Sequence, residues 1–107
     1  MSAPQVIANY EALFALTRQM HEAATQGQWE PLISIEGERN ALLAEIKVLD
    51  AQTRLDTASS QRKDALLQSI LAADVQTRDL VTAWMDQFQI TMQSASQEMR
   101  LLKKYGA

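Results

Sequence analysis

Apolar residues recur at alternating steps of three and four along most of the chain, a spacing that places them on one face of an α-helix. The 107 residues include 3 Gly and 2 Pro, so turn residues are few and the helices must be long. The chain shows no internal repeat and is too short for two separate cores. It is therefore predicted to form one all-α domain over residues 1–107.

The first predicted helix covers residues 3–26. Ser2 and Gln5 have the spacing of a capping box, and Pro4 is tolerated in the first turn because its missing N–H would have no partner there. Gly27 is expected to end the helix as a left-handed cap. The apolar face of this helix consists of Val6, Tyr10, Leu13, Thr17, Met20 and Ala24.

The second predicted helix covers residues 30–50, with Pro31 in its first turn. Because the joint between the two helices is only a few residues long, they are expected to lie antiparallel, with Trp29 at the turn. Gly37 falls on the solvent side of this helix. The opposite side carries Leu32, Ile35, Arg39, Leu42, Ile46 and Leu49.

The last half of the chain begins with a connection over Asp50–Ser60, where Asp, Thr and Ser favour local hydrogen bonds to the backbone. A long third helix is predicted over residues 60–93. Ser94-Ala95-Ser96 is weak in helix propensity, which predicts a hinge and a short fourth helix over residues 95–105. The predicted fold is an antiparallel up-down-up three-helix bundle with this short C-terminal fourth helix.

The third predicted helix is longer than its two neighbours. At 1.5 Å per residue, helices of about 20 residues span about 30 Å, whereas residues 61–93 would span about 50 Å. The excess segment, residues 81–93, is strongly apolar and needs a cover: the folded-back C-terminus, a second copy of the chain, or an amphipathic helix of another protein. The expected partner-binding residues are Trp84, Met85, Phe88, Met92, Val81 and, at the first joint, Trp29.

A second interpretation of these apolar residues stays open. Apolar side chains at helical spacing usually mean burial, so the same residues would fit the core of a four-helix or kinked bundle. Three of the five methionines, Met85, Met92 and Met99, lie in the last quarter of the chain. Flexible thioethers suit a surface that repacks against different partners, which favours the partner-binding interpretation.

The sequence offers little for catalysis. It contains no Cys and one His, and the residue four positions after His21 is Thr25, so no metal-binding His pair forms. No nucleophile motif or Gly-rich phosphate loop is present. Arg39 lies in an apolar seam, where it is expected to reach the edge or pair across helices, because the other basic residues, Lys47 among them, do not converge on its face. We expect no enzyme, cofactor or metal.

Charge and hydropathy restrict the partners. The net charge of -3 gives no positive field for nucleic acid, so direct nucleic-acid binding is not expected. No secretion signal and no run of about 18 apolar residues is present, so membrane insertion is not expected either. With no Cys as well, the chain is expected to be cytoplasmic.

One short stretch carries a family resemblance. Ala24-x-x-Gly27-x-Trp29-Glu30-x-Leu32 resembles the flagellar export chaperone family FliT. The surrounding pattern and the tail are similar too: Leu13, Leu16 and Met20 before the stretch, Arg39, Leu42 and Leu43 after it, and Tyr105-Gly106 at the end.

The resemblance implies a cytoplasmic chaperone and its partners. FliT chaperones bind the C-terminal helical region of the filament-cap protein FliD, prevent its premature assembly, and deliver it to the export gate and the export ATPase components. In some members the family also restrains a flagellar transcription regulator. The alternative is a structural homo-oligomer, such as a homodimer paired through the third helix, or a regulatory adaptor with no export client.

The resemblance further implies a C-terminal helix that regulates access to the client surface. Met99, Leu102 and Tyr105 are the residues expected to form this regulatory lid. In the resting state they would lie against Trp84, Met85 and Phe88, and an amphipathic segment of the client would displace them. This chain stops almost at Tyr105-Gly106, so the lid helix would be short.

Overall fold

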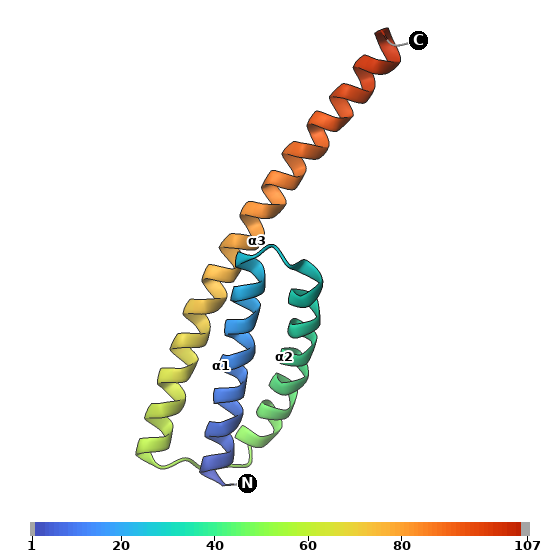
Figure 1. The fold of residues 1–107 in the computed structure, drawn as a ribbon. Coiled ribbons are helices and arrows are strands. Elements are labelled where there is room, and N and C mark those ends of the chain that lie inside the picture. The colour runs from blue at the N-terminus through green and yellow to red at the C-terminus, as the bar shows by residue number, and fades with distance from the viewer. Residues whose placement is uncertain (1, 106–107) are drawn as a thin grey trace. The chain divides into compact units, whose positions relative to one another are not determined.

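The computed structural model describes residues 2–105, and the side chains of residues 2–104. These residues form three α-helices and no strand: α1 over Ala3–Thr25, α2 over Trp29–Asp50 and α3 over Thr57–Tyr105 (Figure 1). The chain divides into two compact units, the first unit Met1–Thr77 and the second unit Arg78–Ala107. The all-α prediction is confirmed, whereas the single domain over residues 1–107 stays a prediction.

Both ends of α1 follow the sequence signals. The Ser2 side chain accepts a hydrogen bond from the backbone N–H of Gln5 at 3.4 Å, and Pro4 lies in the first turn. Gly27 has φ 68°, the left-handed conformation that glycine adopts without steric cost. Its N–H donates to the Ala24 carbonyl, and the N–H of Gln28 donates to the Ala23 carbonyl, which together form a Schellman motif.

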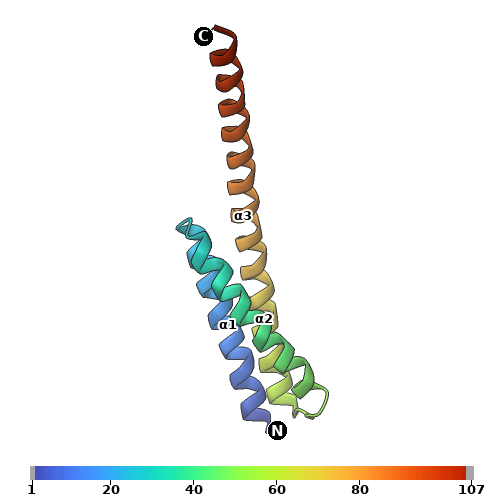
Figure 2. The same cartoon turned by 90° about the vertical axis from the view of Figure 1, so that its right-hand side faces the viewer.

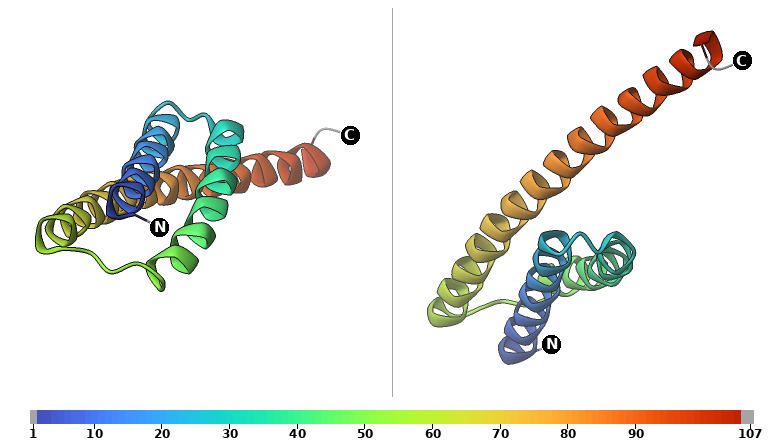
Figure 3. Two further views of the ribbon diagram at one scale, coloured as in Figure 1. Left: turned by 90° about the horizontal axis from the view of Figure 1, so that it is seen from below. Right: turned by 45° about the horizontal axis from the view of Figure 1, so that its top comes forward.

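The first unit has one hydrophobic core. α1 and α2 run in opposite directions and are joined by residues 26–28, as Figure 1 and Figure 3 show. The connection between α2 and α3, residues 51–56, lies at the end where α1 begins (Figure 2). Because all three helices contribute to the core, the first turns of α3 belong to the same unit as α1 and α2. The buried residues of this core cluster are Val6, Tyr10, Leu13, Ile46, Leu66 and Ile70.

Asp50, the last residue of α2, joins all three helices at one end of this core. The Tyr10 hydroxyl of α1 and the Lys63 ammonium of α3 both donate to the same Asp50 carboxylate oxygen, the latter at 3.0 Å. The ammonium also lies 5.4 Å from the centre of the Tyr10 ring. Sequence reasoning missed this cluster, because Asp50 falls at the start of the expected connection.

Arg39 and Asp74 link α2 to α3 near the other end of the core. Their side chains form an ion pair and are 17% and 27% exposed, so Arg39 does pair across helices. The hydroxyl of the buried Thr77 donates a hydrogen bond to the Ala73 carbonyl at 3.0 Å. Asp74 and Thr77, two polar residues of α3, therefore both have partners inside the first unit.

α3 differs most from the prediction. It begins at Thr57, because the Asp56 carboxylate caps it by accepting the backbone N–H of Ser59 at 2.8 Å. Hydrogen bonds from the side chain and from the backbone N–H of Ser59 hold the pKa of Asp56 below its usual value. The helix then continues without interruption through residues 94–96 to Tyr105. The predicted hinge and the fourth helix over residues 95–105 are wrong, because serine weakens a helix but does not end it as glycine or proline would.

Candidate functional site

A row of exposed apolar side chains runs along one face of α3 in the second unit. Steps of one, three, four and seven between neighbours keep these residues on one side of the helix. We call this row the α3 stripe; it consists of Val81, Trp84, Met85, Phe88, Met92, Met99 and Leu102. Val81 is half-buried, and the other six are between 42% and 63% exposed.

Two aromatic rings lie in the N-terminal part of the α3 stripe. Trp84 and Phe88, one turn apart, are stacked with ring centres 5.6 Å apart and planes inclined by 12°. They are 42% and 47% exposed. Large apolar side chains forgo about 1.5–3 kcal/mol each when they stay in water, so this surface gains stability from any apolar cover.

The predicted partner-binding residues fall into two groups. Five of them, Val81, Trp84, Met85, Phe88 and Met92, lie together on the α3 stripe. Trp29 belongs to the first unit, where it is the half-buried first residue of α2. The structure therefore brings together the five residues of α3.

The predicted lid residues extend the same stripe. Met99 and Leu102 follow Met92 with Ala95 between them at steps of three and four, so the seam continues where a separate helix is expected from the sequence. Along one helix, Met99 lies about 22 Å from Trp84, so the two side chains are not in contact. The side chain of Tyr105 lies outside the described residues. The lid role of these three residues stays a prediction.

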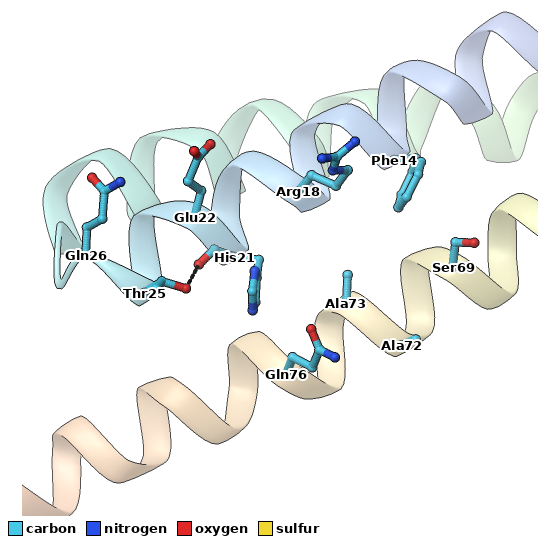
Figure 4. Close-up of a pocket in the computed structure, with 10 residues that line it drawn as sticks. All are labelled: Phe14, Arg18, His21, Glu22, Thr25, Gln26, Ser69, Ala72, Ala73 and Gln76. Carbon is cyan, nitrogen blue, oxygen red and sulfur yellow. Dashed lines mark hydrogen bonds between the residues drawn. The ribbon is translucent and has the colours of Figure 1, made fainter.

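A second candidate site lies within the first unit, in an open groove of about 730 Å³ between α1 and α3. Phe14 and His21 of α1 point toward α3, and Ala73 and Gln76 of α3 line the opposite wall (Figure 4). The Arg18 guanidinium lies 5.9 Å from the centre of the Phe14 ring. The groove mixes one aromatic ring with small and polar side chains.

The polar side chains that line this groove are not joined as a catalytic pair or triad would be. His21 is half-buried, as a boundary residue, and the hydroxyl of Thr25 donates to its backbone carbonyl at 2.9 Å. Ser69 and His21 both line the groove, but among the described residues no hydrogen bond joins their side chains as it would a nucleophile and its base. Among the described residues, no three His, Cys, Asp or Glu side chains gather as a metal site would require.

None of the three described helices combines the length and apolar character that crossing a membrane requires. No curated protein and no solved structure matches the chain. One family model matches residues 7–107, nearly the whole chain, and its description is flagellar protein FliT. That family consists of flagellar export chaperones and is not a family of known enzymes. This chain has three helices and an exposed apolar helix face. Because the family model matches residues 7–107, the chain belongs to the FliT family.

Proposed function

We propose that this protein is a cytoplasmic flagellar export chaperone that binds the C-terminal helical region of the filament-cap protein FliD. In this proposal the chaperone keeps FliD from assembling before export and delivers it to the export gate and the export ATPase components. Membership of the FliT family supports the chaperone class. The observation that carries the client-binding part is the exposed α3 stripe with its stacked Trp84 and Phe88.

The chemistry of the α3 stripe suits a helical client. An amphipathic helix presents apolar anchors at steps of three and four, which match the spacing of Val81, Trp84, Met85, Phe88 and Met92. Aromatic residues supply most of the energy at such interfaces, and methionines adapt to the partner's shape. A bound client helix would remove this apolar surface from water.

The proposal includes the arrangement of the first unit. We propose that α1, α2 and the first turns of α3 form an antiparallel up-down-up bundle. The shared core and the short connections, residues 26–28 and 51–56, support it. In this arrangement the first unit is the folded support, and the second unit presents the binding surface.

Calorimetric titration with a peptide of the FliD C-terminal region tests the client-binding role. Changing Trp84→Ala together with Phe88→Ala should weaken binding by at least about 2 kcal/mol, or about 30-fold, because the client loses two aromatic contacts. Ile90→Ala is the matched control, since Ile90 is 56% exposed but lies on the opposite side of α3. Equal affinity of the wild type and the double variant would remove the α3 stripe from the proposal.

The alternative function is a structural homo-oligomer or a regulatory adaptor without an export client. A homodimer could cover the α3 stripe by pairing two copies of α3 as a coiled coil. Sedimentation at low micromolar concentration distinguishes the two functions. An elongated dimer that gives no heat with the FliD peptide would favour the homo-oligomer.

A further inference from the structure

The solvent-facing side of α2 carries a second apolar row that the first unit does not use. Ile33 is 68% exposed and Val48 is 59% exposed. Gly37, Ala41 and Ala44 lie between them at steps of four and three, and Gly37 is exposed. We call these five residues the outer face of α2.

α2 is therefore apolar on two opposite sides. The side toward the core buries Leu32 and Ile46. Around the helix axis, Ile33 and Val48 are separated from those two buried positions by at least about 100°. A surface helix normally carries charged and polar residues opposite its core side. A helix with apolar rows on both sides is typical of one that packs between two neighbours.

Gly37 is the most informative residue of this face. Glycine in the middle of a helix weakens the helix, so its presence needs a reason. The first unit provides none, because a Cβ on Gly37 would meet no atom within 4 Å. With small residues at positions 37, 41 and 44, the backbone of a second helix could approach α2 more closely than larger side chains would allow.

The charge around this face selects the kind of partner. Glu38 and Glu45 follow one margin, Glu36 lies on the other, and Glu30 lies in the first turn; all four are exposed. Among the described residues, none of these four carboxylates forms an ion pair. Lys47 is the one exposed basic residue described in α2. The outer face of α2 therefore carries a net negative charge and would attract cationic side chains.

We propose that the outer face of α2 docks a basic amphipathic helix supplied by another protein. Small and apolar residues of that helix would pack over Gly37, with Ile33 and Val48 at the two ends of the contact. Its Lys or Arg side chains would lie beside Glu38 and Glu45. A second copy of α2 fits less well, because it would bring these carboxylates against their own copies. This inference concerns a different surface from the α3 stripe and does not depend on the FliD client.

A designed peptide tests the proposal without knowledge of the natural partner. The probe is a fluorescein-labelled amphipathic helix of about 20 residues, with Ala and Leu on one face and Lys along both margins. The comparison peptide has Glu in place of every Lys. Fluorescence anisotropy should show the Lys peptide binding at least about tenfold more tightly, with an affinity that falls as salt rises.

Two variants locate the site. Gly37→Leu should weaken binding of the Lys peptide at least about tenfold, because the added side chain blocks close approach while the charge is unchanged. Glu38→Lys with Glu45→Lys should weaken the Lys peptide and strengthen the Glu peptide. Circular dichroism of each variant shows whether α2 stays helical.

Two controls keep the proposal falsifiable. Glu22→Lys with Asp64→Lys makes the same charge change on exposed positions of α1 and α3, and should alter binding much less. Trp84→Ala with Phe88→Ala weakens the α3 stripe as a competing site for an amphipathic helix, and this variant should still bind the Lys peptide more tightly than the Glu peptide. Binding that is lost in this second variant but kept in Gly37→Leu would overturn the proposal. So would self-association of the wild type that Gly37→Leu abolishes, because the occupant would then be a second copy.

Discussion

At the scale of single residues, Gly27 and Gly37 differ in backbone conformation, although a Cβ added at either position would meet no atom within 4 Å. Gly27 has φ 68°, which alanine adopts only with strain. Gly37 lies inside α2, where alanine is the better helix former. The two positions therefore offer the same substitution with opposite expected effects.

Gly37→Ala should raise the free energy of unfolding by about 0.5–1 kcal/mol, because alanine loses less backbone freedom in a helix. Gly27→Ala should lower it by about 1 kcal/mol, because the Schellman motif then holds a strained residue. Urea unfolding followed by circular dichroism measures both. A stabilising Gly27→Ala change would contradict the left-handed cap.

Tyr10 makes the stability of the fold depend on pH in the alkaline range. Burial of the phenol, its hydrogen bond to Asp50 and the charge of that carboxylate raise the pKa of Tyr10 well above its ordinary value of 10.0. Below about pH 10 both the folded and the unfolded chain keep this proton, so the contribution to stability is fully present. At higher pH the unfolded chain loses the proton first, and the contribution falls.

Comparing the wild type with Tyr10→Phe isolates this effect. The variant should lose about 1 kcal/mol of stability near neutral pH, because the hydrogen bond to Asp50 is gone. Above about pH 10 the difference between the two proteins should shrink, since only the wild type has this phenol to titrate. Urea unfolding at a series of pH values measures the difference. A constant gap from neutral to alkaline pH would argue against the buried phenol.

At the scale of elements, α3 serves two purposes along its length. Ile70 is 5% exposed in the core of the first unit, whereas Phe88 is 47% exposed in the second. Ile70→Ala should therefore cost about 2–5 kcal/mol of stability, and Phe88→Ala less than about 0.5 kcal/mol. Urea unfolding of the two variants makes the comparison within one helix. A large loss for Phe88→Ala would mean that the ring belongs to a core.

The lid proposal also belongs to α3. A fold-back of Met99, Leu102 and Tyr105 onto the two stacked aromatic rings would require the helix to break near Ser94-Ala95-Ser96. Deleting residues 95–107 should then tighten binding of the FliD peptide, because no competing segment remains. Ser94→Ala with Ser96→Ala should tighten it too, because alanine favours the continuous helix.

These two variants separate a lid from an extended binding surface. If Met99 and Leu102 contact the client instead, the deletion should weaken binding, and the double serine variant should leave it unchanged. Calorimetric titration distinguishes the outcomes. Unchanged affinity in both variants would remove Met99, Leu102 and Tyr105 from any role in access.

Sequence reasoning located the helices better than it located their ends. The three-four spacing, Pro4 and Gly27 fixed α1 and α2 to within a residue or so, because each signal acts locally. The start of α3 at Thr57 was missed because Asp56 can be either a loop residue or a cap. The continuation past residue 94 differs from the prediction because low propensity only weakens a helix, whereas glycine or proline stops it strongly.

The polar contacts were the least predictable part. The place of Arg39 in an apolar seam predicts that its guanidinium has a partner. The identity of that partner, Asp74, depends on the packing of α2 against α3. The cluster of Tyr10, Asp50 and Lys63 joins three helices and has no signature in any one of them. The α3 stripe, in contrast, is visible in the sequence as a row of apolar residues at helical spacing.

At the scale of the whole molecule, the first unit buries a hydrophobic core to which all three helices contribute, whereas the second unit leaves most of its large apolar side chains exposed. The two units therefore have different expected responses to a client. Binding should reduce the opening of α3 in the second unit and leave the core of the first unit nearly unaffected.

Amide hydrogen exchange measured with and without the FliD peptide tests this difference most directly. We predict that the client slows exchange in residues 81–92 of α3, and that exchange around Leu13 and Ile70 in the core changes little. Trp84→Ala with Phe88→Ala should abolish the slowing at the same peptide concentration. Protection confined to α1 and α2, with residues 81–92 unchanged, would contradict a client surface on α3.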